Sequence, residues 1–144
     1  MGIGTHEKTH FLLCRCPRRK SHATNLPGEV ALQLCPSLLA NFQMPKHVIV
    51  VTGTNGKTTV TNLIGNVLKK CGNDIITNAF GGNVDTGIAS LLLANSKLNG
   101  TLTADTLLLE MDERSAQRIL PYVKPDYLVC TNLQRDSMKR NAHV

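Results

Sequence analysis

A glycine-rich segment with the sequence GTNGKTT, at residues 53–59, carries the residue types that bind a nucleotide phosphate. It follows a β-branched run and precedes a helical apolar pattern, which is the strand, loop and helix context that a phosphate-binding loop requires. Glycines let backbone N–H groups approach phosphate oxygens, and the N-terminus of the following helix adds partial positive charge at the same point. The predicted cofactor contacts are therefore Gly53, Thr54, Asn55, Gly56, Lys57, Thr58 and Thr59.

Two side chains of this segment have distinct predicted roles. We expect Lys57 to neutralise the β- and γ-phosphates and Thr58 to place its hydroxyl on Mg²⁺. The general phosphate-loop pattern has an earlier glycine where this chain has Val51, so only the second half of the pattern is matched. The alternative interpretation is a glycine turn that only caps a helix.

Glu110 is the second candidate for catalysis. It follows three leucines at the predicted end of a strand, and its carboxylate could hold Mg²⁺ directly or through water, because hard cations prefer oxygen ligands. We therefore predict Lys57 and Glu110 as catalytic residues, and Thr58 and Glu110 as metal ligands. For Asp112 and Glu113 we expect the plainer role of acidic residues at a helix start, which satisfy the helix dipole.

Further polar residues follow the last predicted strand. Asn132 is a further predicted cofactor contact, and Arg135 and Asp136 come shortly after it. Arg135 could steady phosphoryl charge, or it could be an ordinary surface arginine. The histidines show no paired spacing, so histidine catalysis is not indicated.

Four short apolar runs, each followed by a connection or helical pattern, must position these residues. We expect strands at 48–51, 74–77, 106–109 and 127–130. Strands that alternate with helices predict an α/β fold of the P-loop NTPase type, a parallel sheet with helices on both faces. Ligands of such sheets bind at the carboxyl ends of the strands, which is where the polar residues named above gather.

Three helices are expected between these strands. The first has an apolar stripe that runs from Val60 to Cys71 at helical spacing. The second could be capped by Asp85, and the third, with Ala116, Ile119, Leu120 and Val123 on one side, is expected to be closed by Pro121.

Residues 1–46 form a basic leader of less regular pattern. Prolines interrupt it often, and only 30–34 and 37–42 could be short helical turns, so we expect it to pack on the sheet or to be partly disordered. A cluster of arginines and a lysine at 15–20 could meet anionic lipid head groups or polyphosphates, or could simply be a solvated segment.

Composition limits the class of protein. The length of 144 residues suits one α/β unit or a piece of something larger. Only 3% of residues are aromatic, which argues against a nucleic-acid reader despite the net charge of +6. The five cysteines include no C-x-x-C pair, which indicates a reducing cytoplasm, and the apolar stretch at 11–14 is too short for a transmembrane segment.

The segment VTGTNGKTT at 51–59 resembles the ATP-binding loop of the Mur ligases and their folylpolyglutamate synthase relatives. Three further stretches resemble the MurT-type subunit of lipid II isoglutaminyl synthase: ATNLPGEVAL at 23–32, LEMDE at 109–113 and KPDYLVCTNLQRDSMKR at 124–140. The resemblance covers about residues 23–140.

The resemblance implies an ATP-dependent amide ligase of peptidoglycan synthesis, located in the cytoplasm at the inner face of the membrane. In that family the D-glutamate α-carboxylate of lipid II takes the γ-phosphate of ATP, and ammonia from a separate glutaminase subunit then displaces the phosphate. The loop at 78–83 resembles a segment that faces the substrate. The implied substrate-contact candidates are Asn78, Gly82, Asn83, Arg135 and Asp136.

The departures from the family are also informative. Muropeptide ligases have a metal-binding histidine in an Asp-His pair, where this chain has Asp136-Ser137, and MurT-type proteins typically have glutamine there and an aspartate where Lys139 stands. A full-length relative continues into a zinc insertion and a C-terminal domain, so residues 47–144 resemble the amino-terminal part of the ATP-binding domain. We expect such a fragment to bind ATP weakly and not to turn over. The alternatives are another Mur or folylpolyglutamate-type ligase and a non-catalytic nucleotide-binding remnant.

Overall fold

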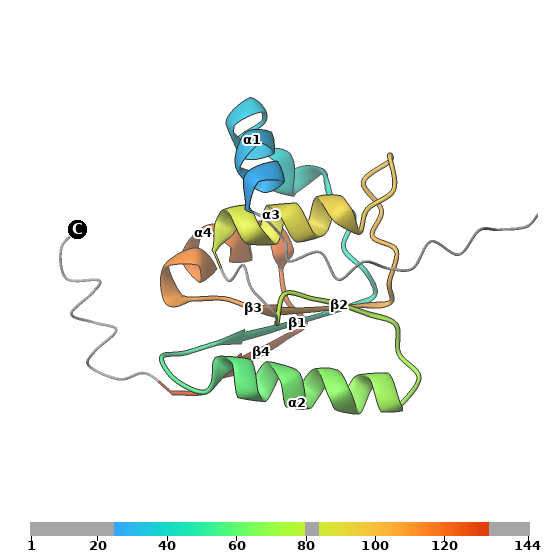
Figure 1. The fold of residues 1–144 in the computed structure, drawn as a ribbon, viewed down its shortest axis with the longest axis vertical. Coiled ribbons are helices and arrows are strands. Elements are labelled where there is room, and N and C mark those ends of the chain that lie inside the picture. Colours follow the sequence, from blue (N-terminus) through green and yellow to red (C-terminus); the bar gives the residue numbers. More distant parts are fainter. Residues whose placement is uncertain (1–24, 80–83, 133–144) are drawn as a thin grey trace, which may run out of the picture.

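The computed structural model describes residues 25–79 and 84–132, which form a four-stranded sheet with helices on both faces (Figure 1). In chain order the elements are α1 (Leu26–Leu34), the 3₁₀ turn η1 (Leu38–Asn41), β1 (His47–Thr52), α2 (Lys57–Lys70), β2 (Ile75–Thr77), α3 (Asp85–Ala94), β3 (Thr106–Glu110), α4 (Glu113–Val123) and β4 (Tyr127–Cys130). The predicted α/β class is confirmed.

All pairings in this sheet are parallel, and the strand order is β2-β3-β1-β4. β1 lies between β3 and β4, with Val51 opposite Glu110 and Thr52 opposite Cys130. The carboxyl ends of these three strands therefore lie side by side, as the sequence predicts. The residues that follow them share one edge of the sheet.

The main hydrophobic core lies between the sheet and the helices α3 and α4, which cover the same face (Figure 1). β3 is buried along its whole length, as expected for an interior strand of three consecutive leucines. Apolar side chains from both layers close this core, among them Val48, Val50, Ile88, Leu92, Leu107, Leu109, Ile119 and Val123. Each fully buried side chain of this size contributes roughly 1.5–3 kcal/mol relative to an exposed one.

α2 covers the opposite face, and the residues that it buries are not those of its apolar stripe. Thr61 and Gly65 are the buried residues of this helix, whereas Leu63 and Val67 of the stripe are 64% and 52% exposed. A Cβ atom at Gly65 would lie 3.4 Å from side-chain atoms of both Ile75 and Leu108. The helix approaches the sheet closely at its smallest residues, so the apolar stripe is turned to one side.

α4 continues through Pro121, where we expected it to end. The helix runs to Val123, and Lys124 then adopts a left-handed conformation with φ of 45°. A proline removes one backbone donor, and in the last turn of a helix this costs a single hydrogen bond. Lys124 N–H still donates to Leu120 O at 2.9 Å, so the turn closes despite the proline.

α1 begins at Leu26, four positions before the expected start at Val30. Pro27 lies in its first turn, where the missing N–H would have no intrahelical partner, so this proline does not break the helix. We expected this segment to pack on the sheet or to be partly disordered. Instead, α1 packs on α3 (Figure 1). The contact is close because Gly28 N–H donates to Ser90 Oγ at 2.7 Å, and a Cβ atom at Gly28 would overlap the carbonyl oxygen of Thr86. The basic cluster at 15–20 lies outside the described residues.

Candidate functional site

Two glycines shape the loop between β1 and α2, each for a different reason. Gly53 has φ of 125°, and a Cβ atom there would lie 2.4 Å from Thr131 Oγ1 and 2.7 Å from Asn132 O. Gly56 has φ of 81° and has open space around it, so only its backbone conformation requires glycine. The loop therefore turns sharply and approaches the end of β4 closely.

Lys57 is the first residue of α2, and its ammonium group lies over the loop. Its Nζ donates to Gly53 O at 2.7 Å and to Thr54 O at 3.2 Å. Val60 N–H donates to Gly56 O. The N–H groups before it belong to the first turn of α2, and N–H groups of a first turn have no carbonyl partner within the helix. The start of α2 thus combines first-turn N–H groups with one positive side chain, as phosphate binding requires.

The two predicted metal ligands lie together. Thr58 Oγ1 donates to Glu110 Oε1 at 2.9 Å, although the residues are 52 positions apart in the sequence. Glu110 ends β3 and is only 6% exposed. Among the described residues, no group of three or more His, Cys, Asp or Glu side chains gathers. A hydroxyl and a carboxylate form a donor set that suits Mg²⁺, which takes its other oxygens from phosphate and water.

Asn78, predicted from the family resemblance to face the substrate, is engaged with the backbone of Glu110. Its Nδ2 donates to Glu110 O and its Oδ1 accepts from Glu110 N–H, both at 2.7 Å. Gly82 and Asn83, the other predicted substrate contacts of this stretch, lie outside the described part of the chain. No sequence pattern predicted the contact between Asn78 and Glu110.

Asn132, predicted to contact the cofactor, fastens the loop in this structure. Its backbone oxygen accepts from Thr54 N–H at 2.9 Å, and its Oδ1 accepts from Asn55 N–H at 3.0 Å. Asn55 O in turn accepts from Asn132 Nδ2 at 3.2 Å and from Thr131 Oγ1 at 2.7 Å. The end of β4 therefore holds the middle of the loop. Arg135 and Asp136 fall beyond the described residues.

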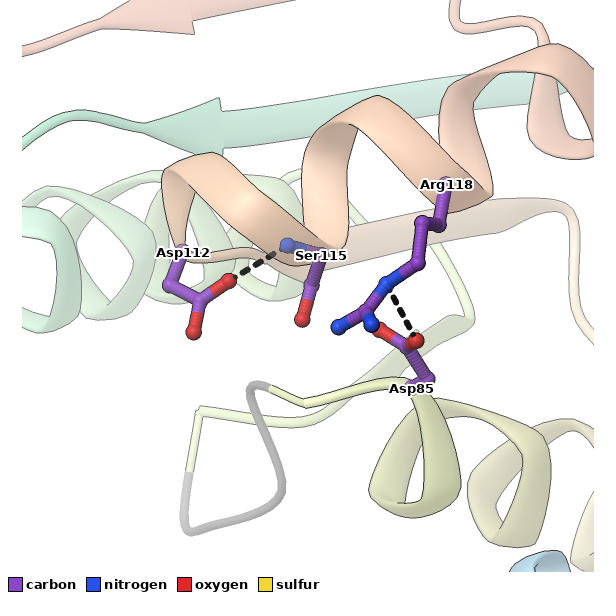
Figure 2. Close-up of polar contacts among 4 residues, drawn as sticks. All are labelled: Asp85, Asp112, Ser115 and Arg118. Carbon is purple, nitrogen blue, oxygen red and sulfur yellow. Dashed lines mark hydrogen bonds and ion pairs between the residues drawn. The ribbon is translucent and has the colours of Figure 1, made fainter. Parts of the chain in front are cut away.

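The start of α4 lies next to the same loop. Asp112 caps this helix by accepting from Ser115 N–H at 2.6 Å, which confirms the structural role expected for it (Figure 2). Glu113 does more than complement the dipole, because its Oε1 also accepts from Thr54 Oγ1 at 3.2 Å. The acidic residues after β3 were the only sequence signal for this contact.

The start of α3 differs from the expectation. Val84 is the N-cap residue, and Asp85 is the first residue of the helix instead of its cap. Figure 2 shows the Asp85 carboxylate directed at Arg118 of α4, and its Oδ2 lies 2.7 Å from Arg118 Nε. This ion pair joins the two helices of one face near the carboxyl edge of the sheet.

Comparison with known proteins identifies similar sequences. The family described as the Mur ligase middle domain matches residues 51–141. The lipid II isoglutaminyl synthase (glutamine-hydrolyzing) subunit MurT of Streptococcus pneumoniae is 40% identical over 145 residues, which cover 100% of this chain and 31% of that protein. The MurT subunit of Staphylococcus aureus is 36% identical, over 94% of this chain and 32% of its own length.

Similarity over a shorter stretch extends to other ligases. The UDP-N-acetylmuramoylalanine--D-glutamate ligase of Leuconostoc citreum is 40% identical over 88 residues, which cover 60% of this chain and 17% of that protein. The chain thus spans about a third of the length of the MurT relatives and less of this one. Within the described part of the chain, no helix has the length and apolar character needed to cross a membrane.

Proposed function

Because the chain belongs to the Mur ligase family through its middle domain, we propose that it forms the phosphate-binding part of an ATP-dependent ligase that amidates the D-glutamate of lipid II. Two features support this function. The MurT relatives match nearly all of the chain, and the phosphate loop, Lys57 and Glu110 meet at one edge of the sheet.

The proposed reaction has two steps. A carboxylate oxygen of D-glutamate attacks the γ-phosphorus of ATP, the bond from that phosphorus to the β-phosphate oxygen breaks, and ADP leaves. Ammonia then attacks the carbonyl carbon of the acyl phosphate, the carbon–oxygen bond to phosphate breaks, and the nitrogen loses a proton to give the amide. The first step is needed because a carboxylate is a poor electrophile until phosphate provides a leaving group.

In this mechanism the residues of the chain mainly stabilise the negative charge of the phosphate groups. Lys57 would move its ammonium from the carbonyl oxygens of Gly53 and Thr54 to the β- and γ-phosphates. Thr58 and Glu110 would hold Mg²⁺, which neutralises charge on the transferring phosphoryl group when it is bound. The N–H groups at the start of α2 would bind phosphate oxygens.

The remaining assignments belong to the whole protein. A glutaminase subunit would supply the ammonia, lipid II would be the acceptor, and the reaction would take place on the cytoplasmic side of the membrane. Asn132 would touch the nucleotide after releasing the loop, and Gly82, Asn83, Arg135 and Asp136 are proposed to face the acceptor. These proposals rest on the names of the MurT relatives and on the family resemblance.

A second candidate is a ligase that adds an amino acid to a nucleotide-linked muropeptide. The match to the UDP-N-acetylmuramoylalanine--D-glutamate ligase of Leuconostoc citreum favours it. It is the weaker candidate because the histidine of the Asp-His pair is replaced by Ser137.

The contact between Thr58 and Glu110 is the observation that carries the proposed function, and ATP titration tests it. In calorimetry the chain should bind ATP more tightly with Mg²⁺ than with a chelator. Lys57→Ala should weaken binding by about 10-fold or more, since it removes a charge-assisted contact to phosphate of about 1.5–3 kcal/mol.

Lys70→Ala is the matched control, because Lys70 is exposed in the last turn of the same helix, far along the axis from the loop. Its affinity should stay within about twofold of wild type, in keeping with a surface substitution. Equal losses in the two variants would indicate a general charge effect and would remove Lys57 from the mechanism.

A further inference from the structure

The end of β3 is held on both of its sides, by backbone on one side and by a side chain on the other. On the β1 side, Met111 N–H donates to Val51 O at 3.0 Å. In a parallel strand, backbone polar groups of successive residues point to alternate neighbours. The N–H and C=O of Glu110 therefore point toward β2, in the same direction as the N–H of Thr106, which bonds to Asp74 O.

β2 is too short to pair with Glu110 through its backbone. Its last ladder pair is Thr77 with Leu108, two residues before Glu110. The Asn78 side chain takes the next position and bonds both Glu110 N–H and Glu110 O at 2.7 Å. Asn78 is 5% exposed, so these are buried bonds that water does not readily replace.

Fixing the backbone of Glu110 fixes the point from which its side chain extends and so limits where its carboxylate can lie. Glu110 has few ways to reorient while its N–H, its C=O and the following N–H are all bonded. Its carboxylate then meets the Thr58 hydroxyl at 2.9 Å. Loss of the Asn78 amide would release one side of this residue at the point where a metal ligand must be held.

The chemistry requires an amide at position 78. One side chain must donate to a carbonyl and accept from an N–H at the same time, and asparagine does both on a short stem. An ionised aspartate can only accept, so it would keep the bond to Glu110 N–H and face Glu110 O without a donor. It would also bring a negative charge against the backbone of Glu110, a residue that already carries a carboxylate.

We propose that Asn78 is a positioning residue for magnesium-bound nucleotide, which acts by holding Glu110 in place through two backbone hydrogen bonds. The inference rests on the proposed function, because it takes Glu110 as the metal ligand. It goes beyond that function by giving Asn78, so far a substrate-contact candidate, a role in the nucleotide site itself.

The test measures ATP affinity of the chain by calorimetry, once with Mg²⁺ and once with a chelator. The ratio of the two dissociation constants reports how much the metal contributes. In Asn78→Ala this ratio should fall by about 10-fold, the low end of what removal of groups that orient metal ligands costs. Affinity in the chelator should stay within about twofold of wild type, since Asn78 has no proposed contact with phosphate.

Three further variants sharpen the result. Glu110→Gln should lower this ratio at least as much as Asn78→Ala does, because it alters the metal ligand that Asn78 only positions. Asn78→Asp keeps the size and one of the two bonds, so it tests the proposal if Asn78→Ala does not fold. Asn66→Ala, an exposed asparagine of α2, is the matched control and should keep the wild-type ratio.

The outcomes separate the inference from the proposed function. If the ATP affinity of the wild-type chain is the same with Mg²⁺ and with the chelator, both the proposed function and the inference are overturned. A magnesium effect that survives in folded Asn78→Ala and Asn78→Asp overturns the inference alone. A loss of affinity that is as large in the chelator as with Mg²⁺ also overturns it, because Asn78 would then support the loop in general.

Discussion

The two faces of the sheet differ in how they are covered. On one face, α3 and α4 close a continuous core that includes Leu107 and Ile119 (Figure 1). On the other face, α2 touches the sheet through Thr61 and Gly65 and leaves part of its apolar stripe exposed. The candidate nucleotide site begins on this second face, where Thr58 of α2 meets Glu110. The main core and the candidate metal ligands therefore lie on opposite faces of the same strands.

The largest expected effect contrasts a leucine from each region. Leu107→Ala removes a fully buried side chain of the α3 and α4 core and should lower the free energy of unfolding by about 2–5 kcal/mol. Leu63→Ala in α2, where the side chain is mostly exposed, should change it by less than about 0.5 kcal/mol. Urea denaturation of both variants measures the difference. Similar losses would mean that the exposed stripe of α2 is covered in solution.

A smaller effect is expected in the phosphate loop. Gly53→Ala places a Cβ atom against Thr131 and Asn132 in an unfavourable backbone conformation, which should cost about 1–3 kcal/mol. Gly56→Ala has the strained φ but no steric overlap, so its loss should lie near about 1 kcal/mol. The same denaturation experiment ranks the two. A larger loss for Gly56 would contradict the close contact between the loop and the end of β4.

The smallest effect concerns the start of α4. Asp112→Ala removes the cap on Ser115 N–H and should lower the free energy of unfolding by about 1 kcal/mol. Asp105→Ala is the matched control, since Asp105 is exposed and precedes a strand. If the control loses as much stability, net charge and not the cap explains the effect.

Much of the sheet could be predicted because its signal is local. The β-branched run of β1 and the three leucines of β3 identify buried parallel strands, and parallel strands bring their carboxyl ends to one edge. The meeting of Thr58 and Glu110 follows from that rule, and the structure has it. The prediction needed only the order of elements and no knowledge of side-chain packing.

The rest depended on contacts between distant segments. Periodicity identifies the apolar stripe of α2 but cannot say which side of the helix faces the sheet. The close approach of the helix to the sheet at Gly65 determines which side that is. Both Pro27 and Pro121 suggest helix breaks. Pro27 lies in the first turn of α1, where its missing N–H would have no intrahelical partner, and after Pro121 the last turn of α4 still closes through Lys124 N–H and Leu120 O. The bonds from Asn78 to Glu110 and from Asn132 to the loop join residues 32 and 77 positions apart, and no local pattern marks them.

The strand order has a consequence for how the chain folds as it is synthesised. β3 lies between β1 and β2, so the first two strands to be made are not neighbours and cannot pair with each other in the native sheet. Both strands gain their shared neighbour only when residues 106–110 have been made, and long-range pairing of this kind is slow. The arrival of β3 also delivers Glu110 to Thr58. Pairing of β3 with β1 therefore also brings together the two candidate metal ligands.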